Sequence, residues 1–374
     1  MPTKIDELLR IAVERDASDL HIKAGRPPLL RIYGKLDALE GHPPLSLEEA
    51  RDIAFSVMDE GQREVFAREW EMDLAYQIQG LARFRVNVMV QREQVGAFFR
   101  TIPLRIQTIE ELRLPQLCRY FAERPRGLVL VTGPAGSGKS TTQAAMLDHV
   151  NKTQGCHIVT VEDPIEFVHE PKTALVNQRE LARDTRSFAN ALKYVLRQDP
   201  DVILIGEMRD LETVALAITA AETGHLVLGT LHTTDAVQTV DRVIDIFPTH
   251  QQQQVRMQLS VNLLGVVSQI LVLRADGRGR VAAFETLVAI PAVRNSIRER
   301  KTYQIGSIIQ TGVKHGMQTL DQSLAQLTLA GIITHEEGES QAKDPVEFNN
   351  LVAMEAAAPD RRRPSVVGAA SAGR

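Results

Sequence analysis

The sequence predicts an α/β protein in which a parallel sheet with crossover helices follows a smaller α+β domain built on antiparallel strands. From about residue 127 onward, short apolar runs alternate with helix-like stretches, as in strand–helix–strand units. Residues 72–103 instead alternate apolar and polar side chains over three runs, with Gly80 and Gly96 near the bends, which is typical of an antiparallel meander. A glycine-rich loop joins the first strand of the later region to a helix. We therefore expect a ligand to bind at the carboxyl ends of the parallel strands.

The composition is that of a globular protein with more than one domain. The chain has 374 residues, of which 44% are apolar, so it is long enough for two or three domains with their own cores. Lys and Arg number 43 and Asp and Glu number 47, which gives a net charge of −4. This near balance provides no general attraction to nucleic acid, and we expect no nucleic-acid partner.

The cysteines and the hydropathy of the chain indicate which cellular compartment and which metal sites to expect. The two cysteines, Cys118 and Cys156, form no C-x-x-C pair, so neither a zinc site nor a disulfide framework is predicted. The N-terminus is charged and helix-like rather than signal-like, and no run approaches the roughly 18 apolar residues of a membrane span. We expect a cytoplasmic protein with no transmembrane segment.

Residues 1–100 form the predicted α+β domain. Ser46 is a suitable N-cap for one of its helices, because its hydroxyl can accept a backbone N–H, and Glu48 and Glu49 favour the first turn. Residues 101–115 follow as a linker with an approach helix. Within the domain, we expect helices over residues 3–16 and 46–70 and strands at 20–22 and 29–36.

Residues 116–343 form the predicted α/β domain. Its apolar runs are bounded by turn residues and predict strands, whereas residues 291–335 are mainly helical. The final stretch, residues 344–374, is predicted to be a disordered tail, because its end is small, polar and basic without apolar periodicity. The expected strands are 127–132, 157–162, 202–206, 226–231 and 280–288.

The segment GPAGSGKS, residues 133–140, has the G-x-x-x-x-G-K-[ST] pattern of a phosphate-binding loop between a strand and a helix. Glycines let such a loop fold tightly, and the following helix N-terminus adds partial positive charge. Lys139 can reach the β- and γ-phosphates, and the Ser140 hydroxyl suits Mg²⁺. The pattern predicts that the chain binds a nucleoside triphosphate. We expect contacts from Gly133, Pro134, Ala135, Gly136, Ser137, Gly138, Lys139, Ser140 and Thr141.

Acidic residues follow two of the predicted strands. Glu207 comes just after the apolar run 202–205, the position of a Walker B acid that binds Mg²⁺, although Glu stands where Asp is usual. Glu162 and Glu166 lie at and just beyond the end of strand 157–162, where Pro164 turns the chain. Either of these two carboxylates could polarise the attacking water.

Two histidines flank the predicted strand 226–231. Their odd separation puts the side chains of His225 and His232 on opposite faces, so a shared metal is not expected. His232 lies at the carboxyl end, where it could contact the γ-phosphate or the next acid. His225 by itself is more typical of a core or surface histidine.

Arginines of the N-terminal meander are candidates for stabilising a transferred phosphoryl group. Arg83 and Arg85 share one face of a strand because they are two residues apart, and Arg100 lies in the next run. Phosphoryl transfer often uses an arginine finger supplied by another subunit. Taken alone, each of these arginines is more typical of a solvated surface charge.

These segments together resemble the PilT-type ATPases that retract bacterial type IV pili, within the secretion ATPase superfamily. The resemblance runs from about residue 4 to about residue 335. ASDLHIKAGRPPLLRIYG, ARFRVN and FRTIP are similar to the N-domain of that family. GPAGSGKSTT is similar to its Walker A, VEDPIEFVH to its Asp box, DPDVILIGEMRDLET to its Walker B and AAETGHLVLGTLHTTDA to its His box. PAVRNSIRE followed by GMQTLD resembles its C-terminal retraction signature.

The resemblance implies a PAS-like N-terminal domain and a RecA-like P-loop ATPase core in a homohexameric ring that hydrolyses ATP with Mg²⁺. Lys139 and Ser140 would bind phosphate and Mg²⁺, Glu166 would activate water, and Glu207 would be the Walker B acid. The implied partner is the inner-membrane platform protein, which would place the motor at the cytoplasmic membrane face. The family's His-box pair corresponds to His225 and His232, and its N-domain arginines to Arg83, Arg85 and Arg100.

Other readings within and outside the family stay open. Ser296 stands where the retraction signature usually has an apolar leucine, and the chain extends beyond the shortest retraction ATPases. It could therefore be an accessory paralogue that assembles with a second retraction ATPase and whose own hydrolysis is dispensable. A pilus-extension or type II secretion ATPase is disfavoured because these usually carry a four-cysteine zinc module. A DNA-translocating motor is disfavoured by the net charge and by an aromatic content of only 5%.

Overall fold

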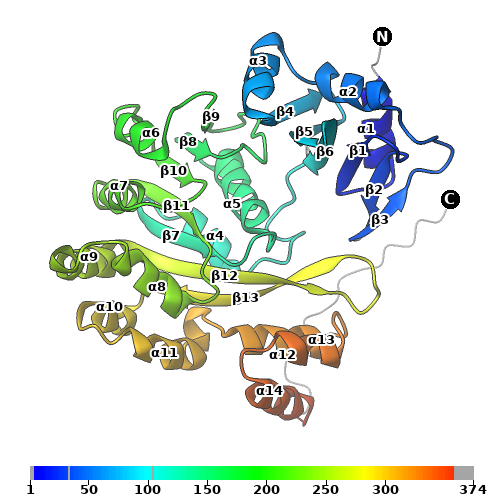
Figure 1. Cartoon of the computed structure of the whole chain (residues 1–374). Helices are drawn as coiled ribbons and strands as arrows, with labels where there is room; N and C mark the ends of the chain where they lie inside the picture. The colour runs from blue at the N-terminus through cyan, green and yellow to red at the C-terminus, as the bar shows by residue number, and fades with distance from the viewer. Residues whose placement is uncertain (1–3, 33, 103–104, 358–374) are drawn as a thin grey trace.

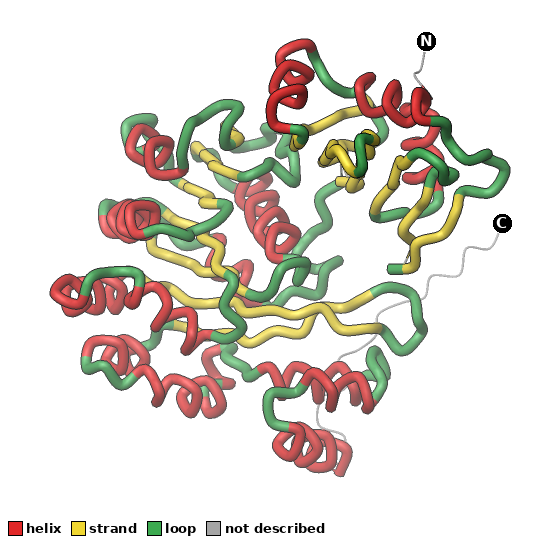
Figure 2. The backbone as a smooth tube through the Cα atoms, in the orientation of Figure 1, coloured by secondary structure: helices red, strands yellow, loops and turns green. Residues whose placement is uncertain are grey.

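The computed structural model describes residues 4–32, 34–102 and 105–357, which form two sheets with their covering helices (Figures 1 and 2). The first sheet has six strands in the order β3-β2-β1-β6-β5-β4, and the second has seven in the order β13-β12-β7-β11-β10-β8-β9. The sheets lie on opposite sides of the molecule, and α5 lies in the region between them (Figure 1).

The six-stranded sheet is antiparallel throughout, as the meander predicts. Phe84 and Phe99 from its central strands are fully buried in one hydrophobic cluster with Ile5 of the first helix and Ile53 of the second. The elements of this part are α1 (Lys4–Glu14), β1 (Asp19–Lys23), β2 (Leu29–Ile32), β3 (Lys35–Ala38), α2 (Leu47–Ser56), α3 (Glu60–Glu69), β4 (Glu71–Ile78), β5 (Ala82–Gln91) and β6 (Gln94–Ile102).

Two expected elements of this part are each divided in two, one by a second helix cap and the other by a tight turn. The expected helix over 46–70 is two helices, since Asp59 caps a new helix through a 2.8 Å bond from the Gln62 N–H. Ser46 caps the first, with Glu49 completing a capping box. The expected strand 29–36 is the hairpin β2–β3, in which Gly34 adopts a φ of 84°.

The seven-stranded sheet is parallel from β12 to β9, and β13 is antiparallel at one edge. The predicted strands 127–132, 157–162, 226–231 and 280–288 have the bounds of β7, β8, β11 and β13, and β10 is one residue shorter than expected. The sequence patterns do not predict β9 or β12. The elements are α4 (Gln116–Ala122), β7 (Gly127–Thr132), α5 (Lys139–Thr153), β8 (His157–Glu162), β9 (Leu175–Glu180), α6 (Phe188–Val195), β10 (Val202–Ile205), α7 (Leu211–Glu222), β11 (Leu226–Leu231), α8 (Ala236–Asp245), α9 (Thr249–Asn262), β12 (Leu263–Leu273) and β13 (Arg280–Val288).

Helices cover both faces of this sheet, which explains why its central strands are continuous apolar runs. Along β7, Leu128 and Leu130 belong to a cluster with residues of α6, α7, α8 and α9. Val129 and Val131 belong to a second cluster with residues of α4 and α5. The alternation along β7 therefore fixes which helices lie on which face.

The C-terminal part is helical, as residues 291–335 predict, but it continues further than expected. The prediction of a disordered tail from residue 344 is wrong for residues 345–357, which form a helix, and residues 358–374 lie outside the described part. Phe348 is fully buried in a cluster with Leu324 and Ile333, and Leu351 and Val352 pack against the same cluster, so one face of the helix is docked. The elements are α10 (Pro291–Arg298), η1 (Thr302–Gln304), α11 (Ile305–Thr311), η2 (Val313–His315), α12 (Leu320–Leu329), α13 (His335–Gln341) and α14 (Pro345–Ala357).

Membrane insertion by a helix is not supported by the described residues: none of their helices combines the length and the apolar character that a bilayer crossing requires.

Candidate functional site

The phosphate-binding pattern lies where β7 ends and α5 begins. Gly133 has a φ of 143°, and a Cβ there would lie 2.2 Å from the backbone oxygen of Gln269. Gly138 is the N-cap of α5 with a φ of 88°. Both positions therefore require glycine, for close approach to β12 in the first case and for a left-handed turn in both. The loop lies at the N-terminus of a helix of 15 residues, a favourable place for phosphate.

Lys139 is the first residue of α5, and its side chain folds back over the loop. Its Nζ donates hydrogen bonds to the carbonyl oxygens of Gly133 at 2.8 Å and Pro134 at 2.9 Å. Burial lowers the pKa of Lys139, and the Glu207 and Glu166 carboxylates oppose that effect. A phosphate offers this ammonium a charged acceptor in place of neutral carbonyls.

Buried polar atoms of the loop and of α5 fit a bound nucleotide. Ser137 Oγ and Gln143 Nε2 are buried with no hydrogen-bond partner among the described residues. Buried donors of this kind normally have a hydrogen-bond partner, so donors without one at a phosphate loop indicate a polar ligand. Ser140 adds a partly exposed hydroxyl beside Lys139. This donor set suits nucleotide phosphate, and it suits Mg²⁺, which commonly combines few protein ligands with phosphate oxygens and water.

Gln269, on β12, is a residue of the site that the sequence patterns do not identify. Its Nε2 donates to the Ser137 carbonyl at 2.6 Å, and its Oε1 accepts from the Thr142 hydroxyl at 2.8 Å. It is 2% exposed, so both bonds lie away from water. One amide thus joins the loop to the first turns of α5. Its only signal in the sequence is a polar residue within the apolar run 263–273.

Glu207 follows β10. This strand pairs with β11, which pairs in turn with β7, the strand that leads into the phosphate loop. The Glu207 carboxylate forms an ion pair with Arg209, and His232 Nε2 lies 3.0 Å from its Oε1. Partial burial alone would raise the pKa of Glu207, but the Arg209 hydrogen bond and the His232 charge outweigh it and the pKa is lowered. The site therefore keeps this acid ionised, as a metal ligand requires.

Glu162 and Glu166 bring two more carboxylates to the same edge. Glu162 accepts hydrogen bonds from Thr160 Oγ1 at 2.6 Å and Gln178 Nε2 at 3.1 Å. Burial raises the pKa of Glu162 to about 7, against the effect of these donors. Glu166 is partly buried and contributes negative charge at both Glu162 and Lys139. Glu207, whose pKa is lowered, is suited to metal binding, and Glu162, whose pKa lies near neutral pH, is suited to proton transfer.

Other candidate residues lie away from this edge. His225 precedes β11, whereas His232 follows it, so the strand separates them by roughly 20 Å. His225 Nδ1 is 2.9 Å from the Ala220 carbonyl oxygen, a contact that holds it at the opposite edge of the sheet. Of the two histidines, the chain brings only His232 to the phosphate loop.

The three N-terminal arginines are held on the other sheet. Arg83 pairs with Glu180 of β9 at 3.0 Å, with both side chains 11% exposed. Arg100 pairs with Asp19 at 2.9 Å, and Arg85 is exposed directly opposite Arg100 in the β5–β6 register. Arg83 therefore reaches the carboxyl edge of the large sheet, because Glu180 is the register partner of Glu162. Among the described residues, neither Arg85 nor Arg100 pairs with a carboxylate of that edge.

Comparison with known proteins places this chain and its fold among secretion ATPases. Residues 101–340 match the family described as Type II/IV secretion system protein. The chain is 52% identical over 344 residues to the Pseudomonas aeruginosa protein named Type IV pilus retractation ATPase PilT, covering 92% of this chain and 99% of that one. It is 43% identical over 351 residues to Type IV pilus ATPase PilU of the same organism, covering 94% and 92%.

A solved structure shares the same architecture. The crystal structure of the pilus retraction motor PilT with bound ADP superposes with a TM-score of 0.86 at 47% identity, over 93% of this chain and 100% of that chain. The similarity extends over both sheets, which confirms the predicted fold class.

Proposed function

The chain belongs to the type II/IV secretion system protein family, among its PilT-type ATPases, and we propose that it hydrolyses ATP to drive retraction of type IV pili and twitching motility. The observation that carries this proposal is 52% identity spanning 99% of a pilus-retraction ATPase. The phosphate loop, with Lys139 folded over it and three carboxylates beside it, provides the chemistry.

In this proposal the loop residues 133–141 bind the triphosphate of ATP, with Lys139 on its β- and γ-phosphates. Mg²⁺, when bound, would neutralise the charge that develops on the transferred phosphoryl group. Ser140 and Glu207 would hold it, since a hydroxyl and an ionised carboxylate are the oxygen ligands that it prefers. His232 would orient Glu207 through their 3.0 Å contact.

Glu166, or its neighbour Glu162, would accept the proton of the attacking water. Glu166 stays exposed enough to meet a water molecule, whereas Glu162 is engaged by two hydrogen bonds. We therefore assign water activation to Glu166 and a supporting role to Glu162.

We also propose a homohexamer in which Arg83, Arg85 and Arg100 stabilise the phosphates of a nucleotide bound by the same subunit or by a neighbouring one. Arg85 supports this role best, because it is exposed and forms no ion pair among the described residues. His225, at the far edge of the sheet, would act across a subunit interface or structurally. The platform protein of the inner membrane would be the partner at the cytoplasmic membrane face.

The proposed division of labour follows the domain boundaries 1–100, 101–115 and 116–343. The first sheet, which reaches Ile102, would be the PAS-like domain that carries the arginines, and the second would be the RecA-like core. The separation of the two sheets is supported by the hydrophobic clusters, because none of the described ones contains residues from both sheets. Ile109 and Leu114 of the linker, and Phe348 beyond residue 343, belong to clusters of the second part.

An accessory role, as in a PilU-like paralogue, is the second candidate. The identity of 43% to PilU over 94% of the chain supports it, but the identity of 52% to PilT is higher. The principal proposal is therefore the main retraction motor.

The test is genetic. The gene is deleted in the source cell and restored as wild type or as Lys139→Ala, and surface pili and twitching motility are counted. We expect hyperpiliated, non-motile cells that only the wild type rescues. Rescue by both alleles would indicate an accessory subunit, and a deletion without phenotype would overturn the retraction role.

A further inference from the structure

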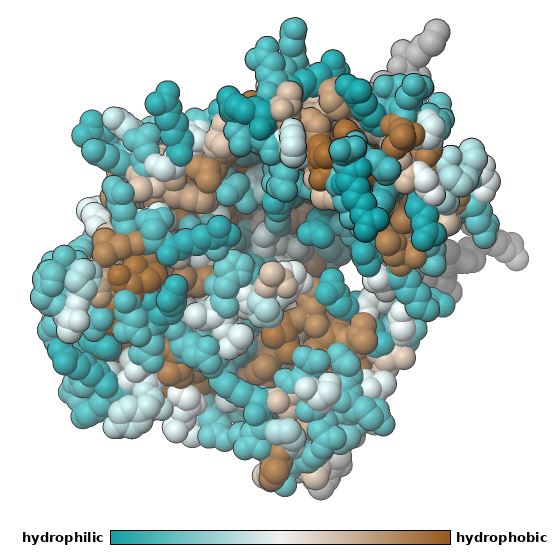
Figure 3. All heavy atoms as spheres, viewed as in Figure 1, coloured by the Kyte–Doolittle hydropathy of each residue, from teal (hydrophilic) through white to brown (hydrophobic). Residues whose placement is uncertain are grey.

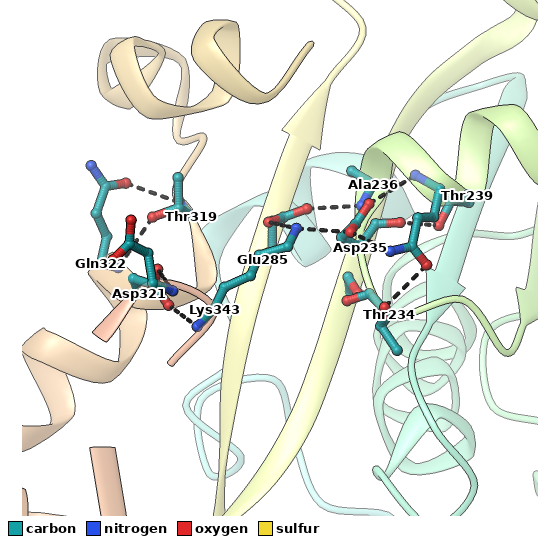
Figure 4. A network of polar contacts seen from close by, with 12 residues as sticks. Thr234, Asp235, Ala236, Thr239, Glu285, Thr319, Asp321, Gln322 and Lys343 are labelled. Atoms are coloured by element: carbon teal, nitrogen blue, oxygen red, sulfur yellow. Dashed lines mark hydrogen bonds and ion pairs between the residues drawn. The ribbon is translucent and has the colours of Figure 1, made fainter. Parts of the chain in front are cut away.

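Three buried carboxylates meet at the junction of the large sheet with the C-terminal helices. Asp235 is 4% exposed at the N-cap of α8, Glu285 is 6% exposed on β13, and Asp321 is 4% exposed in α12. The side chain of Lys343, which follows α13, extends toward Asp235 and Glu285 (Figure 4). Buried carboxylates of this density require a cation or strong donors to remain ionised.

Lys343 supplies that cation, and Asp321 fixes its backbone. Its Nζ lies 2.8 Å from Asp235 Oδ2 and 4.0 Å from Glu285 Oε2. Its backbone N–H donates to Asp321 Oδ1 at 2.7 Å, and the next N–H, of Asp344, donates to Oδ2 at 3.0 Å. One lysine thus joins three elements that are distant in sequence. Within the described residues, both ion pairs of Asp235 and Glu285 are with Lys343.

Asp235 connects this junction to the phosphate-loop edge. It lies three residues after His232, which pairs with Glu207. Its carbonyl oxygen accepts the Thr239 hydroxyl at 2.6 Å, and that hydroxyl lies 3.4 Å from Thr132 Oγ1. Thr132 is the last residue of β7, directly before the phosphate loop. The turn 232–235 is therefore held between the lysine on one side and the strand of the loop on the other.

Glu285 holds the same turn from the sheet. Its Oε1 accepts the Ala236 N–H at 2.8 Å, so the first residue of α8 is tied to β13. Burial raises the pKa of Glu285, and the Ala236 N–H and the Lys343 charge oppose this effect. Without the lysine charge, Asp235 and Glu285 would repel each other across the N-terminus of α8.

We propose that Lys343 is a positioning residue for ATP hydrolysis, which holds the turn 232–235 so that His232 meets Glu207. This inference rests on the function proposed above. It assigns a role to a residue at the edge of the C-terminal segment, about 110 positions after the histidine that it positions. The lysine side chain is 54% exposed, so its charge acts through local contacts with buried acids rather than through burial of its own.

The test compares steady-state ATP hydrolysis by the full chain with that of Lys343→Met. We expect kcat to fall about tenfold with KM for ATP changed less than twofold, because the phosphate loop itself is intact. Lys301→Met is the matched control, since Lys301 pairs with Glu299 and is 48% exposed, and it should retain wild-type kcat. Thermal unfolding of each variant establishes that it is folded.

A second variant separates charge from packing. Glu285→Gln keeps an oxygen acceptor for the Ala236 N–H but removes one negative charge, so Lys343→Met/Glu285→Gln should recover most of the lost kcat. Lys343→Arg should stay near the wild type. Should Lys343→Met fail to fold, Lys343→Gln with and without Glu285→Gln gives the same comparison.

Wild-type kcat in a folded Lys343→Met variant, or equal loss with and without Glu285→Gln, would overturn the positioning role alone. ATP hydrolysis by Lys139→Ala at the wild-type rate would overturn the proposed function itself, and with it this inference.

Discussion

Glu162→Gln should make the protein more stable at neutral pH and leave its stability at acid pH unchanged. The glutamine retains an oxygen that can accept the Thr160 hydroxyl and the Gln178 amide, which now bond Glu162 at 2.6 and 3.1 Å. It differs from glutamate mainly in lacking an ionisable proton. The substitution therefore isolates the free energy of ionising this partly buried side chain.

The magnitude follows from the pKa of Glu162, which burial raises from 4.5 to about 7. Between these values the folded state holds more protons on Glu162 than the unfolded state does. The stability that this side chain contributes is therefore fully present below pH 4.5 and is lost as pH rises through 7. At about 1.4 kcal/mol per pKa unit, the loss is at most about 3 kcal/mol. The Gln variant escapes this loss, so its advantage over the wild type should grow across that window.

The assay is urea unfolding of the nucleotide-free protein at intervals from pH 4.5 to 8.5, with Glu170→Gln as the control. Glu170 is exposed eight positions further along the same segment, so its substitution controls for the removal of a carboxylate that faces solvent. A constant difference between Glu162→Gln and the wild type across the range would refute the reasoning. It would mean that Glu162 ionises in the folded protein at its ordinary pKa.

Three further predictions concern the C-terminal helix, the loop and the lysine. Phe348→Ala should destabilise the protein by about 3–5 kcal/mol in thermal or urea unfolding, because the ring is fully buried, whereas Met354→Ala, at 72% exposure, should have little effect. Equal effects would mean that α14 is not docked. Gln269→Leu should weaken ADP binding about five- to fiftyfold by calorimetry, because two buried hydrogen bonds to the loop are lost; unchanged affinity would exclude that role. Lys139→Ala should abolish ATP turnover, and normal hydrolysis in that variant would contradict the phosphate-loop assignment.

The parts of the fold that depend on local pattern could be predicted from the sequence. Strands such as β7, β8 and β11 are buried apolar runs with glycine, histidine or acidic residues at their ends, and their predicted bounds are those of the structure. Strand β12 escapes prediction because α9 runs into it directly, with Leu263 as both helix cap and first strand residue and no turn residue between. Helix α14 escapes because its apolar contacts, Phe348 with Leu351 and Val352, cover little more than one turn, and the small, polar and basic residues after them dominate the composition of the last 31 positions.

The site divides in the same way. The phosphate loop, Glu207 and the carboxylates after β8 are recognisable because each lies within a few residues of a strand end. Gln269 and Lys343 are not, since Ser137 and Asp235, which accept from their side chains, lie more than 100 positions away. The contact of Gln269 also depends on the strand order β13-β12-β7. Arg83 illustrates the converse: its strand was predictable, but its pairing with Glu180 required the relative placement of two sheets.

The separation of the hydrophobic clusters has a thermodynamic consequence for movement between the sheets. Among the described residues, each cluster belongs to one sheet and its helices, so a rotation of one sheet against the other would expose little apolar surface. Heat capacity changes in proportion to the apolar area exposed, so such a rotation should have a heat-capacity change near zero. A van't Hoff plot of this rotation would then be nearly straight. Its slope, the enthalpy change, would come mainly from polar contacts such as that of Arg83 with Glu180. Unfolding of either part, in contrast, would give a strongly curved plot.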